Sequence, residues 1–169
     1  MPECYADTLL IQTLVPTLRG YNHKHSCFKV ESSMKESDKF AVGIIDNDKK
    51  QIKYLSQFNI IDLYKDDLIL WKHKVKHHYI IQICPALEKW ILKVCEMEGI
   101  DLVDFELEND LDGLKRITKS LSSMYNKRLE GLFKEIRNTQ NESVGKLKGW
   151  IDLLKVENYR IDINDLKNV

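Results

Sequence analysis

Apolar residues recur at helical spacing in the first part of the chain and then form one uninterrupted run. A helix is expected over residues 7–19, where the i, i+3, i+4, i+7 pattern is filled by Ile11, Leu14, Val15 and Leu18. A shorter helix is expected over residues 28–37. Residues 40–45 (FAVGII) are apolar on both faces, as is typical of a central strand covered by helices. The alternation of helix and strand indicates an α/β protein.

Further strands are expected beyond this run. Residues 51–58 are expected to form a short helix, and residues 59–63 and 68–75 to form two strands separated by a turn at Asp66-Asp67. Residues 78–84 predict another strand. Pro85 then suits the first turn of a helix, because proline lacks the N–H that this turn leaves unused.

After residue 108 the pattern is wholly helical, with three amphipathic helices that each need a surface to bury their apolar side. We expect a mostly parallel central sheet flanked by helices, with an antiparallel hairpin and a helical C-terminal part. Residues 1–100 are expected to form the α/β core, and residues 101–169 a helical extension packed on the same domain. The helical extension is also a candidate surface for a homodimer or a partner protein.

Composition narrows the function only slightly. The 169 residues suit one domain, and 26 basic side chains balance 26 acidic ones, so any nucleic-acid contact must come from a local basic patch. The four cysteines form no close CxxC pair, which predicts reduced thiols in a cytoplasmic protein. The N-terminal sequence lacks the pattern of a signal peptide, and no apolar run approaches the ~20 residues of a membrane span.

The strand over residues 40–45 ends in Asp46-Asn47-Asp48, which is the first candidate for chemistry. In an extended chain, side chains two residues apart point the same way, so the carboxylates of Asp46 and Asp48 repel unless a cation lies between them. Hard oxygen ligands suit Mg²⁺ or Mn²⁺, with Mg²⁺ typically taking one or two carboxylates plus water and phosphate. The plainer alternative is a solvated turn, which Lys49 and Lys50 would extend.

Two further acidic residues, Glu3 and Asp7, stand directly before the first helix, where they could simply favour its N-terminus. Together with the strand that ends in Asp-x-Asp, this order resembles the TOPRIM fold of topoisomerases, primases and small nucleases. The resemblance implies that Asp46 and Asp48 bind Mg²⁺ and that Glu3 is a general acid/base or a third ligand. Asp7 matches the family's second acidic position.

The resemblance covers roughly the first 90 residues and has three departures. Cys4 stands where the family has glycine, and only Met1 and Pro2 precede Glu3, so the first family strand is missing or very short. The second family strand is also hard to find before Phe28.

A second segment supports the same family. Residues 84–90 (CPALEKW) resemble the Pro-x-x-Glu-x-Trp segment of small TOPRIM-like defence nucleases, which makes Glu88 a further candidate catalytic carboxylate. A surface glutamate in the first turn of a helix is the alternative.

Basic residues and histidines supply the remaining candidates. On a strand, Lys72, Lys74 and Lys76 would share one face, which could follow a phosphate backbone or protect an exposed sheet edge; we favour the edge. Lys49 and Lys50 could also contact a phosphate. His23 and His25 could shuttle protons near the acidic residues, bind zinc with Cys27, or lie in a plain surface loop.

The leading hypothesis is therefore a Mg²⁺-dependent phosphodiester-processing enzyme, a nuclease acting on DNA or RNA, with phage defence as the context that the resemblance implies. The alternative is a catalytically inactive TOPRIM-like module that docks a partner protein through its C-terminal helices. No phosphate-binding loop, dinucleotide fingerprint or nucleophile elbow occurs in the sequence.

Overall fold

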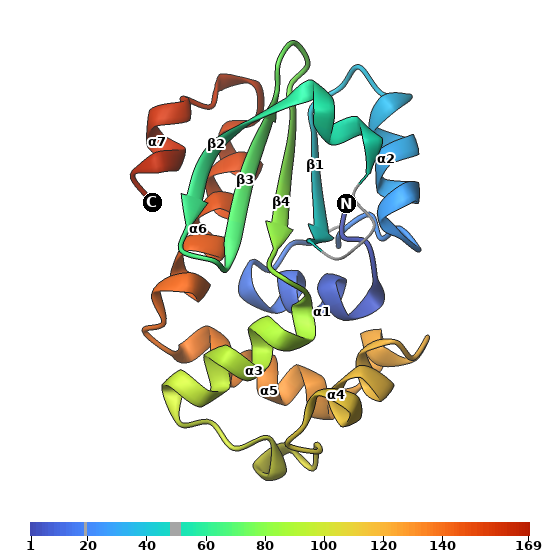
Figure 1. Ribbon diagram of the computed structural model, residues 1–169, viewed down its shortest axis with the longest axis vertical. Helices are drawn as coiled ribbons and strands as arrows, with labels where there is room; N and C mark the ends of the chain where they lie inside the picture. Colours follow the sequence, from blue (N-terminus) through green and yellow to red (C-terminus); the bar gives the residue numbers. More distant parts are fainter. Residues whose placement is uncertain (19, 48–51) are drawn as a thin grey trace.

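A four-stranded mixed sheet forms the centre of the protein in a computed structural model that describes residues 1–18, 20–47 and 52–169 (Figure 1). The strand order is β1-β4-β3-β2, in which β1 is parallel to β4 and the other neighbours are antiparallel. The strands are β1 (Ala41–Asp46), β2 (Phe58–Tyr64), β3 (Leu68–His73) and β4 (His78–Ile83).

The expectation of a mostly parallel sheet is wrong. The chain passes from β2 to β3 through residues 65–67, and from β3 to β4 through residues 74–77. Connections this short can only join antiparallel neighbours, because a parallel crossover needs a dozen or more residues. Only the passage from β1 to β4, which includes the whole β2–β3 hairpin, is long enough to return the chain in the same direction.

The first residues of the chain extend the sheet at its β1 edge. Pro2 forms a parallel bridge with Ile44. The N–H of Glu3 donates to the Ile44 carbonyl, and the Ile44 N–H donates to the Met1 carbonyl, both at 3.1 Å. Residues 1–3 therefore pair with β1 through a single isolated bridge and do not form a full strand.

Helices cover both faces of this sheet. On one face, Val30 and Met34 of α2 pack against Ile45 and Ile80. A Cβ on Gly43 would lie 2.9 Å from Val30, so glycine lets α2 approach β1 closely. The helices are α1 (Tyr5–Leu14), α2 (Cys27–Lys35), α3 (Leu87–Glu98), α4 (Leu111–Thr118), α5 (Lys127–Asn138), α6 (Glu142–Glu157) and α7 (Ile163–Lys167).

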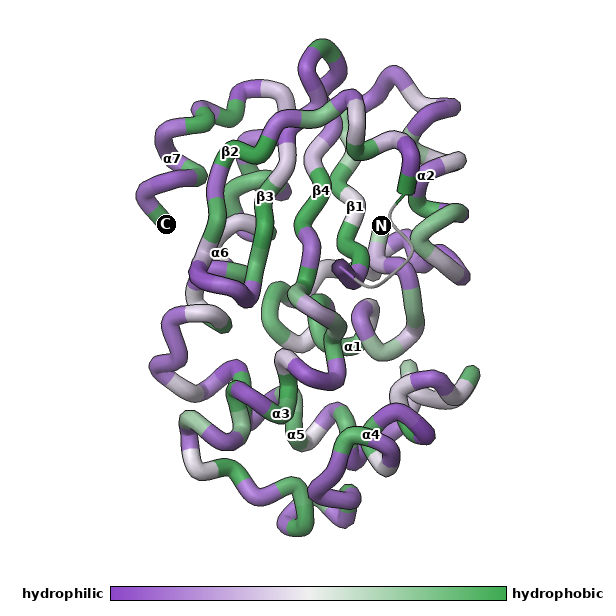
Figure 2. The backbone as a smooth tube through the Cα atoms, viewed as in Figure 1, coloured by the Kyte–Doolittle hydropathy of each residue, from purple (hydrophilic) through white to green (hydrophobic). Residues whose placement is uncertain are grey.

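The opposite face carries the larger part of the core, to which most of the remaining helices contribute (Figure 2). Ile44 and Ile81 pack there with α1, α3, α5 and α6. The apolar stripes of α5 and α6, which suggested a docking surface, are buried in this core, for example at Phe133 and Trp150. No described helix has the length and apolar character that crossing a membrane requires.

Most element predictions are confirmed, but two helix boundaries are wrong and one helix is missing from the prediction. The helix α1 ends at Leu14 because the residue before a proline is pushed out of the helical region, and Val15 has φ −131° and ψ 83°. The helix α3 begins at Leu87 instead of Pro85. The short helix α7 was not predicted.

Two buried histidines lie at the end of the sheet where β4 begins. The Nδ1 atom of His73 accepts the N–H groups of Val75 and Lys76, and that of His78 lies 2.9 Å from the Tyr54 hydroxyl. The Nε2 atom of His78 faces the Lys39 carbonyl at 3.0 Å and must therefore be its donor. The His73 ring is neutral in this arrangement because its Nδ1 accepts two N–H groups, and burial is the main cause that lowers the pKa of both histidines.

We expect these histidines to make the fold acid-sensitive. An unfolded histidine takes up a proton near pH 6.5, whereas the folded rings resist protonation, so their stabilising contribution is present above about pH 6.5 and is lost as the pH falls towards the lower folded pKa. Denaturation with urea between pH 8 and pH 5 should show a falling free energy of unfolding. His78→Gln should reduce this slope, while His77→Gln at an exposed neighbour should not; equal slopes in all three proteins would contradict the prediction.

Candidate functional site

An acidic cluster, formed by Glu3, Asp7 and Asp46, lies where residues 1–3 and β1 end side by side. These two segments run parallel, so their carboxyl ends lie together at one end of the sheet. The N–H of Asp46 donates to Oε2 of Glu3 at 3.3 Å. Residues 43 positions apart in the sequence are thereby brought into contact.

The helix α3 also points at this cluster. The N–H of Leu87, the first residue of α3, donates to Oδ1 of Asp46 at 2.9 Å. The unsatisfied N–H groups at a helix N-terminus carry partial positive charge, which stabilises a carboxylate there. The N-terminus of α3 therefore holds the Asp46 carboxylate, while the Asp46 N–H binds Glu3.

Asp7 has both a structural and an electrostatic part in the cluster. Its Oδ2 accepts the N–H of Cys4 at 3.0 Å, while the Cys4 thiol accepts the N–H of Asp7 at 3.3 Å, so the two residues cap α1 reciprocally. Asp7 is only 2% exposed. Burial raises its pKa well above the ordinary value, and the negative charges of Asp46 and Glu3 raise it further.

We expect Asp7→Asn to stabilise the fold at neutral pH. The amide oxygen can still accept the Cys4 N–H, while the repulsion from Asp46 and Glu3 disappears. Because the folded pKa of Asp7 is raised, the wild-type carboxyl stabilises the fold below about pH 4 and loses that contribution as the pH rises through the folded pKa. The melting temperature of the variant should exceed that of the wild type by about 2 °C or more at pH 8.

The same comparison at pH 4 provides the control for this prediction, because there the wild-type Asp7 is protonated and the difference should shrink. A variant that melts lower than the wild type at pH 8 would contradict the repulsion.

The donor set of the cluster fits a hard divalent cation. Carboxylate oxygens are the ligands that Mg²⁺ prefers, and this ion commonly takes one or two of them with water completing its shell. Within the described residues no group of three or more His, Cys, Asp or Glu side chains is arranged to hold a metal ion. Glu3 and Asp46 would thus be a two-carboxylate site. The predicted ligand Asp48 and the predicted phosphate contacts Lys49 and Lys50 lie outside the described residues.

Glu88 lies next to the cluster but is turned to a different partner. It follows Leu87 in the first turn of α3, yet its Oε1 accepts the hydroxyl of Thr118 at 2.6 Å. Its exposed fraction is 7%, so the surface-glutamate alternative is wrong. A catalytic part for Glu88 stays a prediction.

The two histidines lie beside the first turn of α1. The His23 ring stacks on Tyr5 with centroids 3.9 Å apart, and His25 meets the His23 ring edge-on at 4.8 Å. The Nδ1 atom of His23 is 3.2 Å from the Thr8 hydroxyl. Burial lowers the pKa of His23, and the charge of His25 lowers it further. The loop is thus packed near Asp7, although its sequence pattern also allowed a plain surface loop.

The lysine row is corrected by the structure. Only Lys72 lies in β3, while Lys74 and Lys76 belong to the turn that follows. The strand β3 lies between β2 and β4, so the preferred interpretation as edge protection is wrong. The Nζ atoms of Lys74 and Lys76 donate to backbone carbonyls of neighbouring segments. This turn is at the far end of the sheet from the carboxyl end of β1 (Figure 1).

Two groups at the site were not predicted from the sequence. Asn47, inside the predicted motif, accepts the Gln82 side-chain amide at 3.4 Å and donates to the Cys84 thiol at 3.5 Å, which ties the end of β1 to β4. Burial raises the pKa of the Cys84 thiol and that of Cys95, the latter to about 11, so both remain protonated at neutral pH. The second group is the backbone N–H of Leu87, which donates to Asp46 and which no side-chain motif indicates.

In comparisons with known proteins, no family model, no curated protein and no solved structure matches the chain.

Proposed function

We propose that the protein is a Mg²⁺-dependent phosphodiesterase, a nuclease acting on DNA or RNA, with the acidic cluster as its catalytic site. The observation that carries the proposal is the contact between Glu3 and Asp46 at the carboxyl edge of two parallel segments. Ligands of α/β sheets gather at this edge. The resemblance of the sequence to TOPRIM domains supports the same assignment, with phage defence as the context it suggests.

In this proposal Glu3 and Asp46 would hold the ion, together with Asp48. A bound Mg²⁺ supplies positive charge that stabilises the developing charge on a scissile phosphate. The α3 N-terminus orients the Asp46 carboxylate through the Leu87 N–H. Asp7, whose pKa is raised by burial and by its acidic neighbours, can hold a proton at a higher pH than an exposed aspartate, as a general acid requires.

The proposal is tested by incubating the protein with end-labelled single-stranded and double-stranded DNA and RNA. Cleavage is expected with Mg²⁺ or Mn²⁺ and should stop in EDTA. Cleavage that persists in EDTA, or no cleavage of any of the four substrates with either ion, would refute the nuclease assignment.

A further inference from the structure

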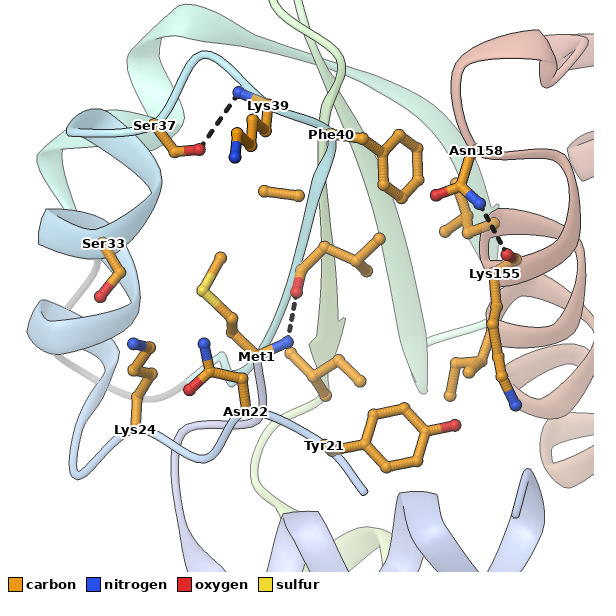
Figure 3. A pocket seen from close by; sticks show the side chains of 15 residues that line it. Met1, Tyr21, Asn22, Lys24, Ser33, Ser37, Lys39, Phe40, Lys155 and Asn158 are labelled. Atoms are coloured by element: carbon orange, nitrogen blue, oxygen red, sulfur yellow. Dashed lines mark hydrogen bonds between the residues drawn. The ribbon is translucent and has the colours of Figure 1, made fainter. Parts of the chain in front are cut away.

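A cavity of about 500 Å³ opens on the edge of β1 between α2 and α6 (Figure 3). Its lining includes Met1, Val42 and Ile44, together with Ser33 of α2 and Leu154 of α6. Small-molecule sites are typically cavities of roughly this size with an apolar lining and a few polar groups.

All charged side chains of the described residues that line the cavity are positive. Three lysines contribute to the lining, and none of the described residues that form the wall carries a carboxylate side chain. Lys155 donates to the Pro16 carbonyl at 2.9 Å and is therefore tied to the rim. Neither Lys24 nor Lys39 has a side-chain hydrogen bond or an ion pair with another described residue. The cavity consequently suits an anionic ligand.

The other lining groups indicate a ligand larger than a bare anion. The rings of Tyr21 and Phe40 lie at opposite ends of the cavity, and amides and hydroxyls stand around it (Figure 3). The Tyr21 hydroxyl donates to the Val15 carbonyl at 2.6 Å, so this ring is held in place. Aromatic rings offer flat faces for stacking a base, whereas lysines suit a phosphate. A nucleotide combines both requirements.

The position of the cavity relates it to the acidic cluster. Alternate residues of a strand point to one face, so Val42, Ile44 and Asp46 share a face of β1. Successive members of this row are about 7 Å apart, so the row runs from the cavity at Val42 past the buried Ile44 to Asp46. A strand of nucleic acid whose phosphate lies at Asp46 can place a following nucleotide in the cavity at Val42.

We propose that this cavity binds one nucleotide of a nucleic-acid strand, next to the phosphate held at the acidic cluster. The inference rests on the proposed nuclease function, because it assigns the phosphate at Asp46 to the substrate strand. Lys24 and Lys39, which lie at opposite ends of the cavity (Figure 3), contact the phosphates on either side of the bound nucleotide, and the apolar lining with Phe40 receives its base.

The test measures binding without cleavage. Isotope-labelled protein with Ca²⁺ in place of Mg²⁺, a cation that takes the same oxygen ligands, is titrated with 5′-phosphorylated single-stranded tetranucleotides of DNA and of RNA, and separately with nucleoside monophosphates, while amide NMR signals are followed. We expect the tetranucleotide to shift the signals of Val42 and Ile44. Lys24→Gln combined with Lys39→Gln should weaken this binding about tenfold or more, because each lysine would lose a charged hydrogen bond.

Lys29→Gln combined with Lys53→Gln removes the same charge at exposed positions outside the cavity and should leave the affinity unchanged. Ser33→Phe, which fills the cavity from α2, should also weaken binding. The inference is overturned if the tetranucleotides do not bind, if the shifts lie elsewhere, if both lysine pairs weaken binding equally, or if only the free monophosphates bind.

These outcomes separate the cavity from the nuclease proposal. Cleavage by the wild type without binding in the cavity would overturn the inference alone. Tetranucleotide binding at Val42 and Ile44 in a protein that cleaves nothing would support the strand site and overturn the nuclease.

Discussion

Replacing Asp46 with asparagine is expected to slow Mg²⁺-dependent cleavage of nucleic acid by about a hundredfold or more, because the substitution removes a proposed metal ligand. The fold should survive, since the asparagine oxygen can still accept the Leu87 N–H. Asparagine removes both the repulsion of Asp7 and the attraction of the charged carboxylate to the α3 N-terminus, so the melting temperature should change little. Initial rates under saturating Mg²⁺ and melting temperatures measure the two effects.

Asp104→Asn provides the matched control for this substitution. Asp104 is exposed in the short helix at Leu102–Phe105, and its loss should change neither the cleavage rate nor the stability. A cleavage rate that is equal in Asp46→Asn and the wild type would place the activity elsewhere or assign it to a contaminant. Loss of activity together with a lower melting temperature would point to misfolding.

The largest effect on stability is expected at Lys146. Its side chain is 9% exposed and pairs with Asp62 of β2 at 2.7 Å. Its Nζ also donates to the Lys167 carbonyl of α7 at 3.2 Å, so one buried ammonium joins α6, the sheet and the last helix. Lys146→Met keeps the length of the side chain but leaves Asp62 unpaired. We expect a loss of about 3 kcal/mol in the free energy of unfolding, the lower end for a broken buried pair, because Asp62 remains 19% exposed.

Chemical denaturation of three proteins tests this expectation. Lys148→Met removes the exposed partner of an i, i+4 pair with Asp152 on the same helix and should cost no more than about 0.5 kcal/mol. The double variant Lys146→Met/Asp62→Leu should recover much of the loss, since no unpaired charge remains. Equal losses of unfolding free energy at Lys146 and Lys148 would show that the buried pair stabilises the fold no more than the exposed pair does.

The sequence identified the elements well because their signals are local. The run FAVGII and the apolar spacing around Trp90 and Trp150 each predict which side of one segment is buried. The predicted antiparallel hairpin is present at β2 and β3, but the predicted parallel majority is wrong. Strand direction depends on how the chain returns, and the short turns at residues 65–67 and 74–77 make the neighbouring strands antiparallel. Three residues that pair with β1 at the N-terminus are also too few to show a period.

The site was only partly predictable for the same reason. Glu3 and Asp46 were named from motif order, and the pairing of residues 1–3 with β1 is what brings them together. The place of Glu88 after a strand predicts a catalytic carboxylate. Its carboxylate instead accepts a hydrogen bond from Thr118, a helix residue 30 positions later in the sequence. The lysines after Trp71 were assigned to one strand face, and the turn that begins after His73 breaks that face. Tertiary contacts decided each of these outcomes.

Crystals soaked in Mn²⁺ and measured at an anomalous wavelength test the metal site most directly. We expect a manganese peak at about 2.1 Å from carboxylate oxygens of both Glu3 and Asp46, and we expect this peak to be missing from crystals of Asp46→Asn. A wild-type map with no peak at these two carboxylates, at a Mn²⁺ concentration that supports cleavage in solution, would contradict the assignment of the acidic cluster as the catalytic metal site.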